Sequence, residues 1–269
     1  MKTTTTRVIV VIAVCVLAMT SCRKKKKQID PFGDGSACPL IAIVDEGGNN
    51  IRDFEWIQKD LMRIYNLDNP KTTFTFRYDD QDQIETMEVV NADELDKIVV
   101  TFTYDEKGYV SETRTSVAGI PIMRNVFTIS DNKISRVNTY VDLFGHSVEG
   151  LTRVEYTGDN VTRVYTTMDN DPEMLAFVGD AYDDKPQFNP KVYRIAALGF
   201  VGIDNNFFSF FSKNNLISGK IYNEKGELDQ KTDIVYEYDK KGLPKSSQNT
   251  IEKGGKTITR NLSYQFLCD

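Results

Sequence analysis

Apolar and polar residues alternate along most of the chain, in short segments separated by polar turns. In the segment from Val154 to Val164, one alternation ends at Tyr156, a polar turn follows, and Val161 starts the next alternation. This pattern predicts a β-hairpin. Aromatic or β-branched residues precede a turn in the same way at Trp56, Tyr78, Tyr104, Ile129, Tyr156, Tyr182, Phe211, Tyr238 and Tyr264, at spacings of 22, 26, 25, 27, 26, 29, 27 and 26 residues. So regular a period predicts one hairpin repeated along the chain.

The turns between these segments support strands on both sides. Asp105-Glu106-Lys107-Gly108, Asn223-Glu224-Lys225-Gly226 and Asp239-Lys240-Lys241-Gly242 are three copies of one turn, in which Gly supplies a positive φ. About eight hairpins in series predict an all-β protein, a long antiparallel meander. Because an open sheet of that size would curl and its edges would be a liability, we expect a barrel or half-barrel. Charged residues recur at outward positions, which argues against a barrel that spans a membrane.

Two stretches fit the repeat less well. Residues 51–65 carry apolar residues at helical spacing, yet Phe54 to Tyr65 overlays Val154 to Tyr165 without a gap, so we predict two strands there rather than a helix. Residues 169–190 interrupt the repeat with three prolines. Residues 195–211 are the most apolar part of the chain after the N-terminus. Their glycines, Gly199 and Gly202, predict a bent or closely approached strand.

The N-terminus has the features of a targeting segment. Lys2 and Arg7 precede an apolar run from Val8 to Met19, which is shorter than a membrane span. Ala18-Met19-Thr20-Ser21-Cys22 resembles a bacterial lipoprotein signal, with Met19 in place of the commoner Leu. The resemblance implies cleavage after residue 21 and a lipid, such as palmitate, on Cys22. An ordinary secretory signal is the alternative. We therefore divide the chain into a signal (1–21), a lipidated basic tether (22–37) and a single β-repeat domain (38–268).

The net charge and the cysteines limit the partners and the compartment expected for that domain. From Cys22 onward the chain has 31 Lys and Arg, after Lys2 and Arg7 are removed from 33, against 39 Asp and Glu. Without the five basic residues of the tether (23–27), residues 28–269 carry a net charge of −13. We therefore expect no nucleic-acid partner. Cys38 and Cys268 stand at the two ends of the domain and predict a disulfide in an oxidising compartment, with two free thiols as the alternative.

The chain also resembles a known family. Tyr-Asp pairs at Tyr78, Tyr104, Tyr182 and Tyr238 look like degenerate YD (Rhs-type) repeats. The segment Tyr182-Asp183-Asp184-Lys185, followed by prolines and then by Phe211-Ser212-Lys213-Asn214-Asn215, resembles a family of Bacteroidetes lipoproteins of unknown function with a porin-like β fold, over roughly residues 39–268. That resemblance implies a β fold and a cell-envelope location, with the outer membrane expected and the facing of the domain left open. It carries over no catalytic residues.

Few residues suggest chemistry. His146 is the only histidine, and no nucleophile or metal-ligand set of familiar spacing accompanies it. Carboxylate pairs are numerous, and a glycoside hydrolase needs only two, but acidic residues are also ordinary turn residues. Oxygen-rich loops at residues 169–173 and at Asp180, Asp183 and Asp184 are weak calcium candidates that lack EF-hand spacing. We expect no catalytic residue and no cofactor other than calcium.

Two functions remain open from the sequence. The first is a non-enzymatic binding module in which the repeat aromatics line a β surface for a glycan or an apolar molecule. Its candidate ligand-binding residues are Trp56, Tyr78, Tyr104, Tyr156 and Tyr238, although aromatic residues at alternate strand positions are usually core. The second is a structural envelope protein that binds a protein partner and no small ligand. A glycoside hydrolase ranks below both.

Overall fold

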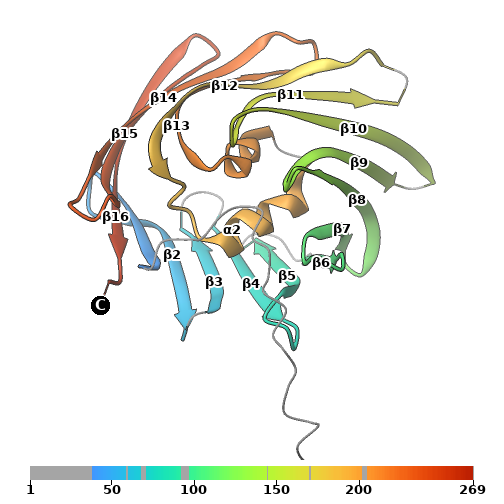
Figure 1. Cartoon of the computed structure of the whole chain (residues 1–269), viewed down its shortest axis with the longest axis horizontal. Coiled ribbons are helices and arrows are strands. Elements are labelled where there is room, and N and C mark those ends of the chain that lie inside the picture. The colour runs from blue at the N-terminus through green and yellow to red at the C-terminus, as the bar shows by residue number, and fades with distance from the viewer. Residues whose placement is uncertain are drawn as a thin grey trace, which may run out of the picture.

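The computed structural model shows a closed barrel of sixteen antiparallel strands (Figure 1). It describes residues 38–58, 60–67, 71–91, 97–143, 145–169, 171–201 and 205–268. The all-β meander predicted from the sequence is confirmed, and the choice between a barrel and a half-barrel is decided for the barrel. The predicted signal, the lipid site Cys22 and the basic tether lie outside the described residues.

Each strand pairs with the next along the chain, and the last pairs with the first. At this seam Ala42 pairs with Gln265 and Val44 with Ser263. The strands are β1 (Leu40–Asp45), β2 (Asn50–Ile57), β3 (Asp60–Asn66), β4 (Thr72–Tyr78), β5 (Ile84–Asn91), β6 (Ile98–Tyr104), β7 (Val110–Val117), β8 (Ile120–Ser130), β9 (Lys133–Leu143), β10 (His146–Thr157), β11 (Asn160–Met168), β12 (Met174–Pro186), β13 (Asn214–Tyr222), β14 (Leu228–Tyr238), β15 (Pro244–Lys253) and β16 (Lys256–Phe266).

Residues 51–65 form β2, a turn and β3, so the repeat predicted this region correctly and the helical spacing did not. The reason is that Phe54 and Ile64 are opposite each other in the ladder and both face the core. The predicted interruption at residues 169–190 is a strand for much of its length. β12 pairs with β13 through several register shifts, which absorb its irregular sequence.

The repeated turn works through its first side chain. Oδ1 of Asp105 accepts hydrogen bonds from the backbone N–H groups of Lys107 and Tyr109, both at 2.9 Å, and Gly108 has φ 86°. The turns that begin at Asp79, Asn223 and Asp239 use the same pair of bonds. A side chain that satisfies two turn donors stabilises the register of the hairpin that the turn closes.

The described parts of the apolar segment, residues 195–201 and 205–211, are not strands, and the strand predicted there is wrong; Gly202 lies outside the described residues. These parts lie inside the barrel as α2 (Lys191–Ala196), η1 (Ala197–Phe200) and η2 (Asn205–Phe211), a unit we call the plug (Figure 1). A barrel of this many strands is too wide to be filled by wall side chains alone. A helical segment that is apolar on several sides fills the space because it satisfies its own backbone hydrogen bonds.

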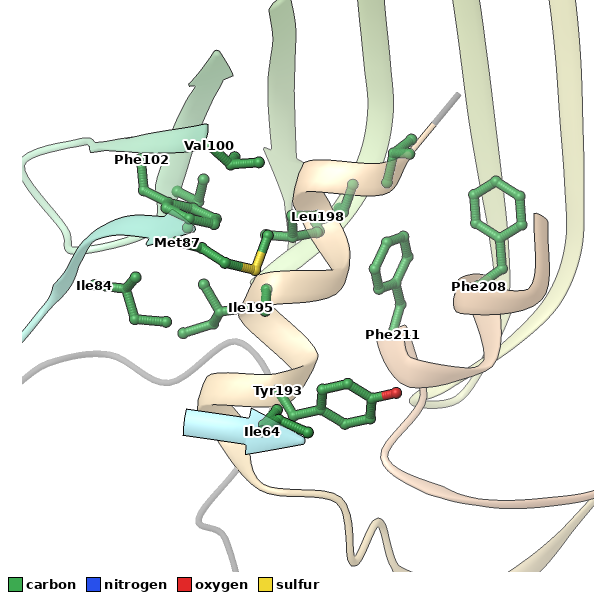
Figure 2. Close-up of a cluster of buried hydrophobic side chains, with 14 of the residues drawn as sticks. Ile64, Ile84, Met87, Val100, Phe102, Tyr193, Ile195, Leu198, Phe208 and Phe211 are labelled. Carbon is green, nitrogen blue, oxygen red and sulfur yellow. The ribbon is translucent and has the colours of Figure 1, made fainter. Parts of the chain in front are cut away.

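The plug packs tightly against part of the wall. Met87 and Phe102 point toward Ile195 and Leu198 of the plug (Figure 2). A Cβ atom added to Gly199 would stand 3.0 Å from a methyl group of Val100. The glycine therefore serves a close approach, as the sequence suggested, but between helix and wall. On the far side, Phe208 and Phe211 pack edge to face at 5.9 Å, and η2 contacts β11, β12 and β13.

The outward side of the strands carries charge. Arg63 pairs with Glu55 across β3 and β2 at 3.2 Å, and Arg77 pairs with Glu88 across β4 and β5 at 3.2 Å. Arg153 on β10 pairs with Glu173 at 2.7 Å. No helix in the described part of the chain is long and apolar enough to cross a membrane.

Candidate functional site

Most aromatic residues of the repeat close gaps in the barrel wall. Paired strands separate near the end where the Asp105 and Asp239 turns lie, and a phenol from the next strand enters each gap. The hydroxyl groups donate to backbone carbonyl oxygens: Tyr78 to Leu61 (2.7 Å), Tyr104 to Ile84 (3.0 Å), Tyr156 to Ile134 (3.0 Å) and Tyr182 to Val161 (2.6 Å). Each accepting residue lies just beyond the last ladder pair of its two strands. We call these four contacts the tyrosine clamps.

Burial changes the acidity of the clamp phenols. Removal from water disfavours the phenolate, so the pKa of Tyr182 is raised to about 12. The pKa values of Tyr78, Tyr104 and Tyr156 are raised above the usual value of 10.0 mainly for the same reason. The hydroxyls therefore remain donors throughout the physiological pH range.

Trp56 and the cysteines lie at the seam. The indole Nε1–H of Trp56 donates to the carbonyl oxygen of Leu40 at 2.8 Å, which repeats the clamp with a different side chain. A disulfide joins Cys38 to Cys268, with the two Cα atoms 4.6 Å apart, and the N–H of Leu267 donates to the carbonyl oxygen of Pro39 at 2.9 Å. The predicted pair of cysteines thus meets where the first and last strands pair.

Tyr238 departs from the clamp pattern. Its hydroxyl donates to Oδ2 of Asp183 and accepts from Nδ2 of Asn215, which also contacts Asp183 at 3.2 Å. The hydrogen bond to the carboxylate adds to the rise in the phenol pKa that burial begins. The predicted ligand-binding role of Trp56, Tyr78, Tyr104, Tyr156 and Tyr238 stays a prediction. Their polar atoms contact the protein itself.

The weak calcium candidates do not converge. Asp180 forms an ion pair with Lys220 at 2.9 Å on the outward face, Asp184 pairs with Lys185 at 3.1 Å, and Asp183 belongs to the Tyr238 cluster. Over the described ranges, no group of three or more His, Cys, Asp or Glu residues is placed to hold a metal ion. A calcium site stays a prediction from the sequence alone. His146 is exposed at the start of β10.

Inward-facing side chains are buried where the wall packs against the plug, and they are exposed to solvent along part of β16. On β6, Val100 is 0% exposed and Phe102 is 7% exposed, whereas the outward Thr101 and Thr103 are exposed. On β16 the same alternation holds from Leu262 to Phe266. It is lost between Lys256 and Asn261, where residues on both faces are exposed.

Register identifies the inward side of that wall. Tyr236 packs on Phe188 with ring centroids 6.0 Å apart, and Tyr264 packs on the same ring at 4.9 Å. Ser247 pairs with Tyr236 in the ladder and contacts the hydroxyl of Tyr264 at 2.8 Å. Because strand side chains alternate, positions an even number of residues from these face the same way. The inward set, which we call the lumen wall, is Gln230, Thr232 and Ile234 on β14, Asn249, Ile251 and Lys253 on β15, and Lys256, Ile258 and Arg260 on β16.

The lumen wall mixes apolar, polar and cationic groups. Ile258 is 48% exposed although it faces inward, and the inward Arg260 and Lys256 are exposed as well. Asn249, opposite Arg260 in the ladder, has a buried Oδ1 without a hydrogen-bond partner in the described protein. Two other buried oxygens share this condition, Oγ1 of Thr113 and of Thr115 on β7, a strand that contacts η1. Orphaned buried acceptors are uncommon and call for an explanation.

The plug presents a row of aromatic rings. Tyr193, Phe210, Phe207 and Phe200 follow one another with centroids 5.2, 5.8 and 5.5 Å apart, and Phe200 contacts Phe74 of β4 at 6.2 Å. Phe200, Phe207 and Phe210 are only partly buried. At the start of the row, the guanidinium of Arg52 donates to the Tyr193 hydroxyl at 2.8 Å and lies 5.3 Å from the centre of its ring.

Sequence reasoning missed the lumen wall, although a signal for it exists. Counting back from Tyr264 by twos places Leu262, Ile258, Arg260 and Lys256 on one face. Two cations in the same phase as core residues mark an inner surface that is not filled by apolar packing. The plug could not be located in this way, because its partners lie on distant strands.

No protein-family model and no curated protein matches the sequence. Among solved structures, the fold is similar to a porin-like protein from Bacteroides uniformis, with 13% identity and a TM-score of 0.47 over 87% of this chain and 92% of that one. It is also similar to a porin-like protein from Bacteroides vulgatus, with 12% identity and a TM-score of 0.48 over 84% of this chain and 97% of that one. The function proposed below rests on the residues of this chain.

Proposed function

We propose that the protein is a lipid-anchored cell-envelope protein whose barrel binds a ligand in its lumen, against the lumen wall, and catalyses no reaction. The observation that carries this proposal is the exposure of inward-facing Ile258, Lys256 and Arg260, in contrast with the buried inner faces of β6 and its neighbours. Covering an apolar side chain that is exposed to water on the inward face of the wall lowers the free energy of the complex.

Two further features support the location. The sequence around Cys22 resembles a lipoprotein signal, and the basic residues after it would lie at anionic headgroups. Ion pairs such as Arg63–Glu55 and Arg77–Glu88 cover outward strand positions, where contact with lipid would be costly. We therefore place the barrel in water beside the membrane that holds the lipid, and we propose the outer membrane for that anchor.

A melting-temperature screen tests the proposal. The chain from residue 22 onward is used with Cys22→Ser, which leaves it unacylated and retains the whole described fold. The compounds are neutral glycans, acidic glycans, neutral lipids and anionic lipids. A ligand at about 100 times its dissociation constant raises the free energy of unfolding by about 2.7 kcal/mol.

The site is checked with two substitutions on one strand. Ile258→Trp places a bulky ring at an inward position of the lumen wall, and Thr259→Trp places the same bulk on the outward face. The expected result is a shift that disappears in the first variant and persists in the second. Failure of every compound would overturn the proposal and favour a structural protein that binds a protein partner.

A further inference from the structure

The inner wall beside η1 carries buried polar side chains on three neighbouring strands. Thr113 and Thr115 of β7, Asn125 of β8 and Thr139 of β9 are each at most 3% exposed. The ladder places Thr113 opposite Asn125, and Asn125 opposite Thr139. We call these four residues the polar strip. Because the burial of a polar group costs free energy unless the group forms a hydrogen bond, each member of the strip needs a partner.

Asn125 and Thr139 have such partners. Oγ1 of Thr139 donates a hydrogen bond to Oδ1 of Asn125 at 2.8 Å. Nδ2 of Asn125 donates to the carbonyl oxygens of Leu198 and Val201, at 3.5 and 3.3 Å. These carbonyl groups lie at the end of η1, where the last carbonyls of a helix lack partners within the helix. The polar strip therefore meets the end of the plug through the plug backbone.

The two threonines of β7 lack a partner of this kind. Their Oγ1 atoms are buried and have no hydrogen-bond partner in the described protein. Because Thr113 and Thr115 are two residues apart on one strand, they face the same way and lie about 6.6 Å apart. β7 contacts η1, and Thr115 is opposite Val100, which packs against Gly199 of η1. Both hydroxyl groups therefore belong to the contact between β7 and η1.

We propose that ordered water binds in the contact between β7 and η1 and links the hydroxyl groups of Thr113 and Thr115 to backbone carbonyl groups at the end of the plug. This inference is independent of the proposed function, because it concerns the plug and not the lumen wall. A buried water molecule typically makes about three hydrogen bonds, to groups that have no other partner. Here each hydroxyl donates to water, and the water donates to a carbonyl oxygen. The end of the plug is then held by the direct bonds of Asn125 and by water-mediated bonds from β7.

Packing around the strip explains why water takes this position. η1 cannot move closer to the wall and bond the hydroxyls directly, because a Cβ atom on Gly199 would already stand 3.0 Å from a methyl group of Val100. Val100 is 0% exposed and Leu198 is 1% exposed, and the two lie on either side of this contact (Figure 2). A small neutral molecule that both donates and accepts suits hydroxyl and carbonyl groups that carry no charge.

Threonine-to-valine substitutions test the energetic part of the inference. Thr113→Val and Thr115→Val keep the shape of the side chain and remove the hydroxyl. If water bonds these hydroxyls, its other partners lose a bond, so the equilibrium constant for urea unfolding should rise at least about fivefold in each variant. The control Thr101→Val makes the same change at an exposed outward position of β6 and should alter the constant less than about twofold. A constant that falls or stays unchanged in the β7 variants overturns the inference, because hydroxyls without any partner are replaced by valine at no loss.

A high-resolution crystal structure of the chain from residue 22 onward, with Cys22→Ser, tests the position of the water. The expected result is water within hydrogen-bond distance of the hydroxyls of Thr113 and Thr115 and of a carbonyl oxygen in residues 197–201. The double variant Thr113→Val and Thr115→Val should lose this water and keep the position of the plug. Hydroxyls that bond directly to the protein, or hydroxyls with no water beside them, overturn the inference whatever the unfolding data show.

Discussion

The hydroxyl of Tyr182 donates a hydrogen bond to the carbonyl oxygen of Val161 at 2.6 Å, and it reaches that atom by passing over Gly179. A Cβ atom on Gly179 would meet the phenol of Tyr182 and would stand 2.5 Å from the carbonyl oxygen of Val161. The glycine is therefore a requirement of the clamp that joins β12 to β11, rather than of a turn.

Gly179→Ala should destabilise the barrel by about 2–4 kcal/mol, because backbone atoms cannot move away as a flexible side chain can. Urea unfolding followed by circular dichroism measures the change. Gly47→Ala is the control. Its added methyl group would meet only the flexible side chains of Asn49 and Asp45, so a change of about 0.5 kcal/mol or less is expected. Equal effects of the two substitutions would argue against the clash.

Tyr156→Phe removes the hydroxyl that satisfies the carbonyl oxygen of Ile134 and keeps the ring. A buried acceptor left without a partner costs about 1–3 kcal/mol, so a loss in that range is expected in equilibrium unfolding. The matched change Tyr165→Phe affects a ring that lies against the guanidinium of Arg153, at 4.2 Å, and should cost less than about 0.5 kcal/mol. An unchanged free energy of unfolding in Tyr156→Phe would show that the clamp adds no stability.

The clamps also predict instability at alkaline pH. In the unfolded chain a tyrosine titrates near 10, whereas burial raises the pKa of Tyr182 and Tyr264 to about 12 and raises those of Tyr78, Tyr104 and Tyr156. Above pH 10 the folded state therefore binds more protons than the unfolded state, and stability falls as the pH rises from about 10 to 12. Phenolate absorbance at 295 nm should rise together with loss of the β-sheet signal. Full titration near pH 10 with the fold intact would contradict the burial.

Cys38→Ser together with Cys268→Ser opens the covalent link beside the β1–β16 seam. The disulfide encloses a sequence separation of 230 residues, and the chain-entropy model gives roughly 5 kcal/mol as an upper value. A loss of about 2–5 kcal/mol is expected, with hydrogen exchange increased most in β1 and β16. Thermal melts in the presence and absence of reductant give the same comparison in the unchanged chain. No difference in either experiment would show that ladder pairing alone holds the seam.

For the site as for the fold, the sequence predicts features that follow from local pattern and does not predict features that depend on contacts between distant strands. The clamp residues stand out in the sequence because the repeat places an aromatic residue before each turn. Their hydrogen-bond partners do not stand out, because each is a backbone carbonyl on a neighbouring strand. The cations Lys256 and Arg260 could be assigned to the inner face by counting from Tyr264. Their exposure could not be assigned, because it depends on where the ladder between β1 and β16 ends.

The sequence by itself determined most of the strands, the repeated turns and the meander order. All of these follow from local alternation and from turn chemistry at positions such as Asp105 and Gly108. Only the tertiary structure decided the conformation of residues 195–211, because a strongly apolar segment adopts whichever form satisfies its backbone in the space available. A lumen of sixteen strands offers room and no free edge, so that segment became helical. The tertiary structure likewise decided which inward positions are exposed, because the ladder between β1 and β16 ends at Leu262 and leaves Lys256, Ile258 and Arg260 without a neighbouring strand on that side.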